Sequence, residues 1–368
     1  MIEISNKNKV RFIFAVSPGL NLQYDGDEDF NTLMIKLNSI YEIGCRDFAI
    51  FFDDISAGEG AGKDQANFLN KLQDSLYKKY SDINPLITVP TQYCRLDMID
   101  KEGNVKQYTE DFVNILNGEI TVLYTGDGVV CDGITDESFK KANEIYKRDL
   151  GIWWNYPVND FLKTKLALGP IEKLPTSNVK SIFFNPMGQV QLSKIALSTG
   201  AEYSNSPETY NSDQSWNKVI ETQFGEIAPA MKVFATHSRH MENSWAKVGP
   251  PDAPEFYEEA HQAVLDTRDK KSKDFSTLIA LIDEMENSAN ILLKNLPSEI
   301  LSECKEQLEQ FQRIIDADRV AVKCLQEGQL DSELKSLRKK ISKYEDKAIL
   351  SEQSAIKFID EVIDILQK

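Results

Sequence analysis

Length, composition and charge narrow the possibilities for this chain. It has 368 residues, 41% hydrophobic and 27% charged, a balance that excludes a disordered, collagenous or fibrous protein. Acidic residues outnumber basic ones 58 to 42, a formal net charge of −16, and a field of that sign repels phosphate backbones and anionic lipid. We therefore expect a globular chain of two or three domains with no nucleic-acid partner.

Side chains suited to metal, redox or triad chemistry are few. The five cysteines are scattered without CxxC spacing, which favours isolated thiols over a disulfide framework or a metal site. His237, His240 and His261 all follow the strand-rich part of the chain, so a catalytic triad or a His-ligated zinc lacks its central residue there. We expect no cofactor and no metal, and any catalysis must use carboxylates.

No segment predicts a membrane span or a secretion signal. No apolar run approaches the ~20 residues that a membrane-spanning helix needs. The N-terminal stretch MIEISN lacks the basic and apolar regions of a signal peptide. As written, the sequence predicts a cytoplasmic protein without a membrane partner.

Short β-rich runs alternate with longer helical stretches over the first two thirds of the chain, which is typical of parallel strands joined by crossover helices. Most runs are continuously apolar, as expected of strands buried on both faces. Amphipathic helices are predicted between them, for example over Asp29–Glu42 and Ala66–Tyr80. The predicted strands are Arg11–Val16, Asp47–Phe52, Leu86–Val89, Ile120–Tyr124, Gly151–Trp154 and Ser181–Phe184.

Polar and aromatic residues follow each predicted strand. The carboxyl ends of parallel strands share one rim, and (β/α) barrels and open α/β sheets build their sites there. The sequence therefore predicts one site formed by the segments Ser17–Gly19, Asp53–Ile55, Pro90–Tyr93, Thr125–Asp127, Asn155–Pro157 and Asn185–Met187.

The last third of the chain is predicted to be helical. The Pro-rich segment Trp245–Phe256 marks a bend or boundary. Beyond it, apolar residues from Phe275 to Leu292 and from Ile356 to Leu366 recur at helical spacing, and Pro297 suits a helix start. We expect a barrel domain over residues 1–207, connecting helices and linker over 208–255, and a helical bundle over 256–368.

A Gly-rich segment, GEGAGKD at Gly58–Asp64, lies between a strand and a helix and calls for comparison with a phosphate-binding loop. The position of the leading glycine holds Ala57, and the position of the metal-binding hydroxyl holds Asp64. Both missing residues are needed, for backbone approach and for magnesium. The segment is therefore interpreted as a loop that shapes a helix N-terminus.

Asp53 and Asp54 are adjacent carboxylates at the end of a predicted strand, where both side chains can turn to one cavity. Two like charges at such range cannot both ionise cheaply, so one pKa rises and that carboxyl can stay protonated as a general acid. The alternative is a helix N-cap with a solvated neighbour, because Asp is a favoured cap. Residue type and position leave both interpretations open.

The short sequence motifs around this pair resemble, in order, those of glycoside hydrolase family 84. This family comprises the β-N-acetylglucosaminidases that include protein O-GlcNAcases and bacterial enzymes once called hyaluronidases. The resemblance covers about residues 12 to 238, plus a helical tail of the expected kind. It is carried by FAVSPGLNLQY (Phe14–Tyr24), FFDDI (Phe51–Ile55), VPTQYC (Val89–Cys94), YTGDGVV (Tyr124–Val130), WWNYPVND (Trp153–Asp160), LGP (Leu168–Pro170), NPMGQVQLSKIAL (Asn185–Leu197), Ser215–Trp216 and FATHS (Phe234–Ser238).

The resemblance implies a retaining hydrolase in which the substrate's own 2-acetamido oxygen is the nucleophile and forms an oxazoline, an exception to the rule of two facing carboxylates. By position, Asp53 would orient and polarise the acetamido group. Asp54 would protonate the leaving oxygen and later activate water. Tyr93 would bond the acetamido carbonyl.

The resemblance also implies the sugar-binding residues. Trp153 would form a hydrophobic wall, and Trp154 is included with it among the substrate-binding residues. Asn155, Asp160 and Asn185 would bind the sugar hydroxyls and the acetamido region. Taken singly, Trp153 could be core, Asn185 before a proline a turn, and Asp160 a surface acid; their joint order favours the site.

The chain also departs from the family. A complete barrel of this family has two further strands upstream. They carry a Gly-Phe-Tyr motif that contacts the sugar and a Lys-Asp-Asp motif whose lysine binds it. Neither motif occurs in this sequence. A (β/α)8 domain typically needs ~250 residues, and roughly two hundred precede the helical part. We therefore expect an α/β fold, an incomplete TIM-type barrel with six of eight strands, followed by an all-α domain.

Function is expected to be hydrolysis of terminal β-linked N-acetylglucosamine from a glycan or O-GlcNAc protein. The alternatives are a non-catalytic carbohydrate- or partner-binding remnant, since part of the sugar pocket is missing, and a helical tail that docks partners beside a relic barrel. Open sheet edges invite pairing, so we also expect an oligomer or a complementing N-terminal segment.

Overall fold

The computed structural model describes residues 1–24, 26–271 and 274–367. It divides into two compact units. Unit 1 comprises Met1–Trp154 and Leu174–Phe183, and unit 2 comprises Asn155–Lys173 and Phe184–Lys368. This division reflects compactness alone, so the domain boundaries expected at residues 207 and 255 stay predictions.

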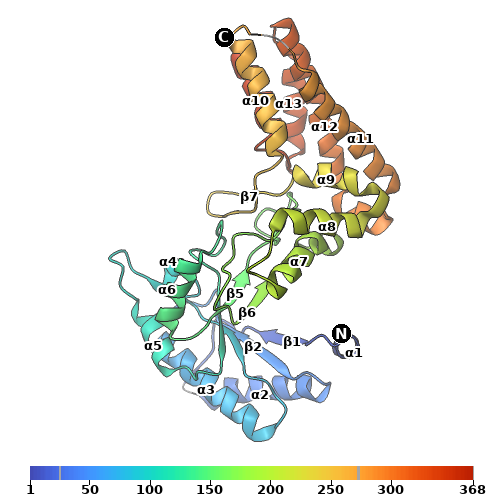
Figure 1. Ribbon diagram of the computed structural model, residues 1–368. Coiled ribbons are helices and arrows are strands. Elements are labelled where there is room, and N and C mark those ends of the chain that lie inside the picture. Colours follow the sequence, from blue (N-terminus) through green and yellow to red (C-terminus); the bar gives the residue numbers. More distant parts are fainter. Residues whose placement is uncertain (25, 272–273, 368) are drawn as a thin grey trace. The chain divides into compact units, whose positions relative to one another are not determined.

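Unit 1 is built on a parallel sheet with the strand order β1-β2-β3-β4-β5-β6 (Figure 1). All predicted strands are confirmed, each within two residues at either end. β1 and β6 lie at the two ends of this order, so each has one edge without a partner strand in the described sheet. The strands are β1 Ile13–Val16, β2 Asp47–Phe51, β3 Ile87–Val89, β4 Thr121–Tyr124, β5 Gly151–Trp154 and β6 Ser181–Phe184.

Crossover helices join β1 to β2, β2 to β3, β3 to β4 and β4 to β5 as the patterning predicts, whereas the segment between β5 and β6 contains no helix. α2 buries Phe30, Leu33 and Leu37, which are three and four residues apart and therefore share one helix face. A reciprocal capping box between Thr135 and Ser138 begins α6. The helices of this unit are α1 Ile2–Lys7, α2 Asp27–Glu42, α3 Ala61–Lys79, α4 Arg95–Met98, α5 Gln107–Ile115 and α6 Asp136–Tyr146.

The Gly-rich segment has structural reasons for its glycines. α3 begins at Ala61, earlier than the predicted Ala66, and its N-cap Gly60 has a left-handed φ of 77° that glycine adopts without a steric cost. Gly62 is already helical, and a Cβ there would lie 2.1 Å from the carbonyl oxygen of Tyr108 at the start of α5. The glycines therefore permit the close packing of α3 on α5.

One face of the sheet carries a cluster of apolar side chains at the core of unit 1. Its fully buried members are Ala49, Ile87, Val89 and Leu123 from three consecutive strands. Partly buried side chains pack against it from five further positions, Ile13, Phe51, Tyr93, Trp153 and Phe183. Alternate residues of a strand face the same side, so these positions define the inner face of the incomplete barrel.

Unit 2 is almost entirely helical, with one two-stranded hairpin. α11 packs against both α9 and α12, while α12 also contacts α13 and α14 (Figure 1). The predicted apolar stripe of the tail is confirmed, because Leu278, Ile282, Met285, Ala289 and Leu292 are all buried on α11. The elements are α7 Val190–Asn205, α8 Ser212–Phe224, a 3-10 turn Gly225–Ile227, α9 Ala228–Thr236, β7 Met241–Glu242, β8 Lys247–Val248, α10 Pro254–Arg268, α11 Ser276–Asn295, α12 Ser298–Glu327, α13 Ser332–Tyr344 and α14 Ala355–Leu366.

A buried ion pair fixes the loops of unit 2. The Nζ atom of Lys165, 1% exposed, lies 3.0 Å from Oδ2 of Asp252 and 2.6 Å from Oε2 of Glu352. The other oxygen of Asp252 accepts the backbone N–H groups of Arg239 and His240. Buried charges persist where they are paired and hydrogen-bonded in this way.

Across the described residues, no helix combines the length and apolar character that crossing a membrane requires.

Candidate active site

The aspartate pair lies in the loop directly after β2. Phe52, which precedes it, donates its backbone N–H to the carbonyl of Val89 at 2.8 Å, and its own carbonyl accepts the Thr91 hydroxyl at 3.0 Å. Asp54 has a left-handed φ of 60°. Such a conformation costs on the order of 1–3 kcal/mol, and Asp is one of the residue types that tolerates it.

The alternative interpretation of the pair as a helix cap is wrong. The next helix, α3, begins at Ala61, and its N-cap is Gly60. Neither carboxylate therefore caps it, and the left-handed turn at Asp54 holds the pair at the end of β2 for a reason other than helix initiation.

Asp53 and Asp54 have different surroundings. Asp53 is half-buried whereas Asp54 is exposed. Burial raises the pKa of Asp53 above its ordinary value, and the negative charge of Asp54 raises it further. Asp53, which the resemblance makes the polarising residue, therefore ionises less readily than an ordinary aspartate.

Tyr93 shares this electrostatic environment. It lies after β3, where its carbonyl accepts the backbone N–H of Thr125 at 3.1 Å. Burial is the main cause that raises the pKa of Tyr93, and the charges of Asp54 and Asp53 add to it. The phenol consequently stays protonated, and its O–H remains available as a hydrogen-bond donor to a carbonyl.

Trp153 lies on the same inner face as Tyr93. Its ring meets Phe51 edge-on, with centroids 5.1 Å apart and an interplanar angle of 78°. Both Trp153 and Tyr93 pack against the apolar cluster of the sheet and remain partly exposed. Unit 1 therefore brings together the aspartate pair, a phenol donor and an indole wall.

Trp154 does not join this group. Neighbouring residues of a strand point to opposite faces, and Trp154 is only 3% exposed. Its Nε1 has no hydrogen-bond partner among the described residues. The structure thus places Trp154 in the core behind β5, while its predicted role in substrate binding stays untested.

The remaining predicted residues belong to unit 2. Asn185 donates from Nδ2 to Oδ1 of Asn155 at 3.0 Å, so the segments that follow β5 and β6 are joined at these two residues. The neighbouring Asn159 donates from Nδ2 to the carbonyl of Lys165 at 2.9 Å and to Oε1 of Gln189 at 3.1 Å.

Asp160 is exposed beside an aromatic pair that the sequence analysis did not single out. The adjacent Phe161 lies with its ring centroid 5.3 Å from that of Trp245 on the β7–β8 hairpin, and Trp245 is 57% exposed. Trp245 lies in the Pro-rich segment, which has no periodic pattern, so only its residue type could have drawn attention to it. Among the described residues, no group of three His, Cys, Asp or Glu side chains is close enough to hold a metal.

Comparison with known proteins identifies the family of this chain. Residues 1–236 match the family model of beta-N-acetylglucosaminidase, and residues 259–359 match a model described as hyaluronidase post-catalytic domain-like. The solved structure CpGH84B superimposes with a TM-score of 0.89 at 33% identity, over 98% of this chain and 66% of that one. The chain belongs to the β-N-acetylglucosaminidases of glycoside hydrolase family 84.

Other relatives are more distant. The protein O-GlcNAcases of Mus musculus and Rattus norvegicus are 29% and 28% identical over 213 and 211 residues. A mutant O-GlcNAc hydrolase of Thermobaculum terrenum shares the fold, with a TM-score of 0.83 at 24% identity over 99% of this chain and 80% of that one. In these two matches the aligned region makes up 55% of this chain but only 23% of the length of each relative.

Proposed function

We propose that this chain supplies the catalytic aspartates of a retaining β-N-acetylglucosaminidase that removes terminal β-linked N-acetylglucosamine from glycans or O-GlcNAc proteins. The observation that carries the proposal is the Asp53–Asp54 pair after β2, beside Tyr93, in a chain of this family. Classical retaining glycosidases place two carboxylates across the sugar, ~5–5.5 Å apart. Asp53 and Asp54 are adjacent in the sequence and would lie on one side of the sugar, which fits substrate-assisted catalysis instead.

In the first step, the acetamido carbonyl oxygen attacks C1 and the bond from C1 to the glycosidic oxygen breaks. Asp54 donates its proton to the departing oxygen. Asp53, as carboxylate, accepts the acetamido N–H and stabilises the positive charge that develops on the oxazoline. Tyr93 positions the acetamido carbonyl through its O–H, and Trp153 packs against the apolar side of the group.

In the second step, Asp54 takes a proton from water as the water oxygen attacks C1. The bond from C1 to the oxazoline oxygen breaks, and the acetamido group is restored with retention at C1. The exposure of Asp54 supports this dual role, because a group that gives and takes protons in turn exchanges them with solvent. Asn155, Asp160 and Asn185 complete the proposal as ligands of the sugar hydroxyls.

The leaving group provides the test of these roles. We expect Asp54→Asn to lose activity mainly on substrates with poor leaving groups, because an activated aglycone departs without a proton. Asp53→Asn should lose activity on both kinds, because the acetamido nucleophile must always be oriented. Steady-state kinetics on 4-nitrophenyl and alkyl N-acetylglucosaminides, with Asp74→Asn at an exposed position of α3 as a control, measure this difference; equal losses in both variants on both substrates would contradict the assignment.

A second candidate is a binding remnant without catalysis. The described sheet has six strands, with no partner strand at the outer edges of β1 and β6, and this observation favours it. A thiazoline that mimics the oxazoline separates the two candidates, since an enzyme binds an intermediate analogue much more tightly than N-acetylglucosamine. Calorimetry that finds equal affinities for both ligands would favour the remnant.

A further inference from the structure

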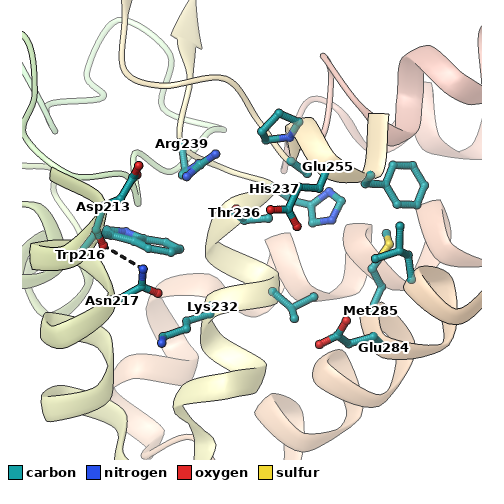
Figure 2. Close-up of a pocket in the computed structure, with 15 residues that line it drawn as sticks. Asp213, Trp216, Asn217, Lys232, Thr236, His237, Arg239, Glu255, Glu284 and Met285 are labelled. Atoms are coloured by element: carbon teal, nitrogen blue, oxygen red, sulfur yellow. Dashed lines mark hydrogen bonds between the residues drawn. The ribbon is translucent and has the colours of Figure 1, made fainter. Parts of the chain in front are cut away.

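Unit 2 contains a cavity of about 520 Å³ that the proposed hydrolase function does not use (Figure 2). Its walls come from α8, α9, α11, the start of α10 and the loop before β7. The volume lies within the range of small-molecule sites. None of the residues predicted to contact the sugar lines it.

Arg239 brings a buried positive charge to this cavity without an acidic partner. It is 9% exposed, and its Nη2 donates to the carbonyl of Pro251 at 2.8 Å. Its Nε has no hydrogen-bond partner, and no carboxylate of the described chain forms an ion pair with the guanidinium. The guanidinium carbon lies 5.6 Å from the ring centre of Trp216, and Figure 2 shows the two side chains together in one wall. Arginine is rarely buried without a counter-charge, so this arrangement calls for an anion.

The backbone of Arg239 is fixed by hydrogen bonds, while its guanidinium has no carboxylate partner among the described residues. Its N–H donates to Oδ1 of Asp252 at 2.6 Å, and its carbonyl accepts the hydroxyl of Tyr156 at 2.9 Å. Oδ2 of Asp252 is taken by Lys165. Asp252 therefore neutralises Lys165 and binds the main chain, and the guanidinium is preorganised for a ligand.

The other basic groups of the cavity do not compete for an anion. Lys232 is paired through Nζ with Oε1 of Glu221 at 2.6 Å. Burial, with a smaller contribution from the charge of Arg239, lowers the pKa of His237 to about 3, and the ring accordingly stays neutral. Its Nδ1 lies 2.9 Å from the hydroxyl of Ser351.

Acidic and apolar side chains restrict which anion fits. Asp213, Glu255 and Glu284 line the cavity and are exposed, so they repel a ligand with several negative charges and attract an ammonium group. Phe256 and Met285 also line the cavity, are buried and present apolar surface to it. Figure 2 shows Glu255 and Glu284 on the side of the cavity that faces Trp216 and Arg239.

We propose that this cavity binds a small zwitterionic carboxylate with an apolar body, of the class of aromatic α-amino acids. The carboxylate lies on the guanidinium of Arg239 and provides its missing counter-charge. The ammonium group faces the acids of the rim, and the apolar body packs against Phe256 and Met285. This inference goes beyond the proposed hydrolysis and does not depend on it.

Methyl NMR of the full chain, labelled at the methionine methyl groups, tests the proposal with L-phenylalanine as probe. Met285 lines the cavity, so its signal, assigned through Met285→Leu, reports binding there, and Met98 in unit 1 is the internal control. We expect L-phenylalanine to shift the Met285 signal alone. 3-Phenylpropionate, which lacks the ammonium group, should bind more weakly, and phenethylamine, which lacks the carboxylate, should not bind.

Variants locate the ligand's carboxylate. Arg239→Met should abolish the shift, and Arg239→Lys should weaken binding by about tenfold or more because the forked guanidinium contact is lost. Arg268→Met, which removes an exposed positive charge at the end of α10, should leave binding unchanged. If Arg239→Met does not fold, Leu281→Trp serves in its place, because it fills the cavity with Arg239 intact and should also abolish binding.

The proposal is overturned if neither carboxylate probe shifts the Met285 signal at millimolar concentration. It is equally overturned if phenethylamine binds as well as L-phenylalanine, or if binding survives in a folded Arg239→Met or Leu281→Trp variant.

Discussion

Two adjacent carboxylates with unlike surroundings carry the proposed chemistry. Asp54 is exposed in a left-handed turn, and Asp53 is half-buried with a raised pKa. The raised pKa therefore disfavours ionisation of the residue that must be ionised in order to accept the acetamido N–H. A carboxylate is ionised above its pKa, so the raised pKa of Asp53 moves the acidic limb of the proposed kcat/KM profile to higher pH.

This coupling predicts the effect of removing one charge. In Asp54→Asn the pKa of Asp53 should fall, because the charge of Asp54 is one of the two causes that raise it. It should remain above the ordinary value, because burial is the larger cause and persists. A carboxyl ¹³C NMR titration measures the shift without any need for activity.

Glu59→Gln is the control for that titration, since Glu59 is exposed and is not among the causes of the Asp53 shift. A pKa of Asp53 that is the same in the native chain and in Asp54→Asn would contradict the coupling. If the protein is active, the acidic limb on an activated substrate should move to lower pH together with the Asp53 pKa.

At the scale of single elements, the described helices of unit 2 include a costly exception to apolar packing. α12 buries Ile314, Ile315, Ala321 and Val322, and among them Asp318 at 0% exposure. Neither carboxyl oxygen of Asp318 has a hydrogen-bond partner within the described residues. Burial raises the pKa of Asp318 well above its ordinary value, because an ionised carboxylate without a partner is costly in apolar surroundings.

A raised folded-state pKa predicts stability that depends on pH. The contribution is fully present below the unfolded pKa near 4 and is lost as pH rises from there toward the folded pKa, by on the order of 1.4 kcal/mol per pH unit. Asp318→Asn does not ionise, so its free energy of unfolding relative to the native chain should increase as the pH rises above about 5, by up to that amount per unit until the folded pKa is reached. Denaturant unfolding followed by helix circular dichroism measures it.

Asp316→Asn is the matched control, because Asp316 lies on the same helix but is exposed. Its free-energy difference from the native chain should hardly change with pH. A difference for Asp318→Asn that is equally flat would show that Asp318 reaches solvent or an unrecognised partner when it ionises.

At the scale of the whole molecule, the six-stranded sheet has outer edges at β1 and β6 without a partner strand among the described residues. β1 pairs with β2 alone in the described sheet, and a cavity of about 410 Å³ near it is lined by Met1, Ile2, Phe12, Phe14 and Ile43, among others. Met1 and Ile43 are 86% and 63% exposed. An unpaired strand edge next to exposed apolar surface is a site of association.

We therefore expect the 368-residue chain to self-associate in a concentration-dependent way. Ile43→Lys should reduce this association, because it places a charge beside the open edge of β1. Ile35→Lys is the control, since Ile35 is similarly exposed at 70% but does not line that cavity. Light scattering measures the mass.

A monomer at all concentrations, together with full catalytic efficiency, would contradict the expected role of the open edges. Addition of a family N-terminal segment with the two missing strands is expected to suppress self-association and to raise activity, because the glycine-rich and lysine contacts to the sugar return with it. Each such hydrogen bond to a charged group is worth ~1.5–3 kcal/mol, so two together change affinity by two to four decades, roughly.

Much of the fold and part of the site could be predicted from the sequence. The six strands and the helices that connect β1 to β5 could be predicted from continuous apolar runs and helical spacing. The family could be predicted from the order of short sequence motifs. Both kinds of pattern are local and do not depend on the rest of the chain. The segments after the strands, including Asp53 and Tyr93, follow from the rule that parallel strands end on one rim.

Other properties were decided only by tertiary structure. Strand alternation separates Trp153 from Trp154, but only the packing against Phe51 and the sheet core shows which indole faces inward. The left-handed turn at Asp54 depends on how the loop after β2 is held to β3 and the segment that follows it. Whether Arg239 finds a counter-charge depends on Lys165, 74 positions earlier in the numbering, which takes the carboxylate of Asp252. Burial and pairing of charges are long-range properties, and no local pattern encodes them.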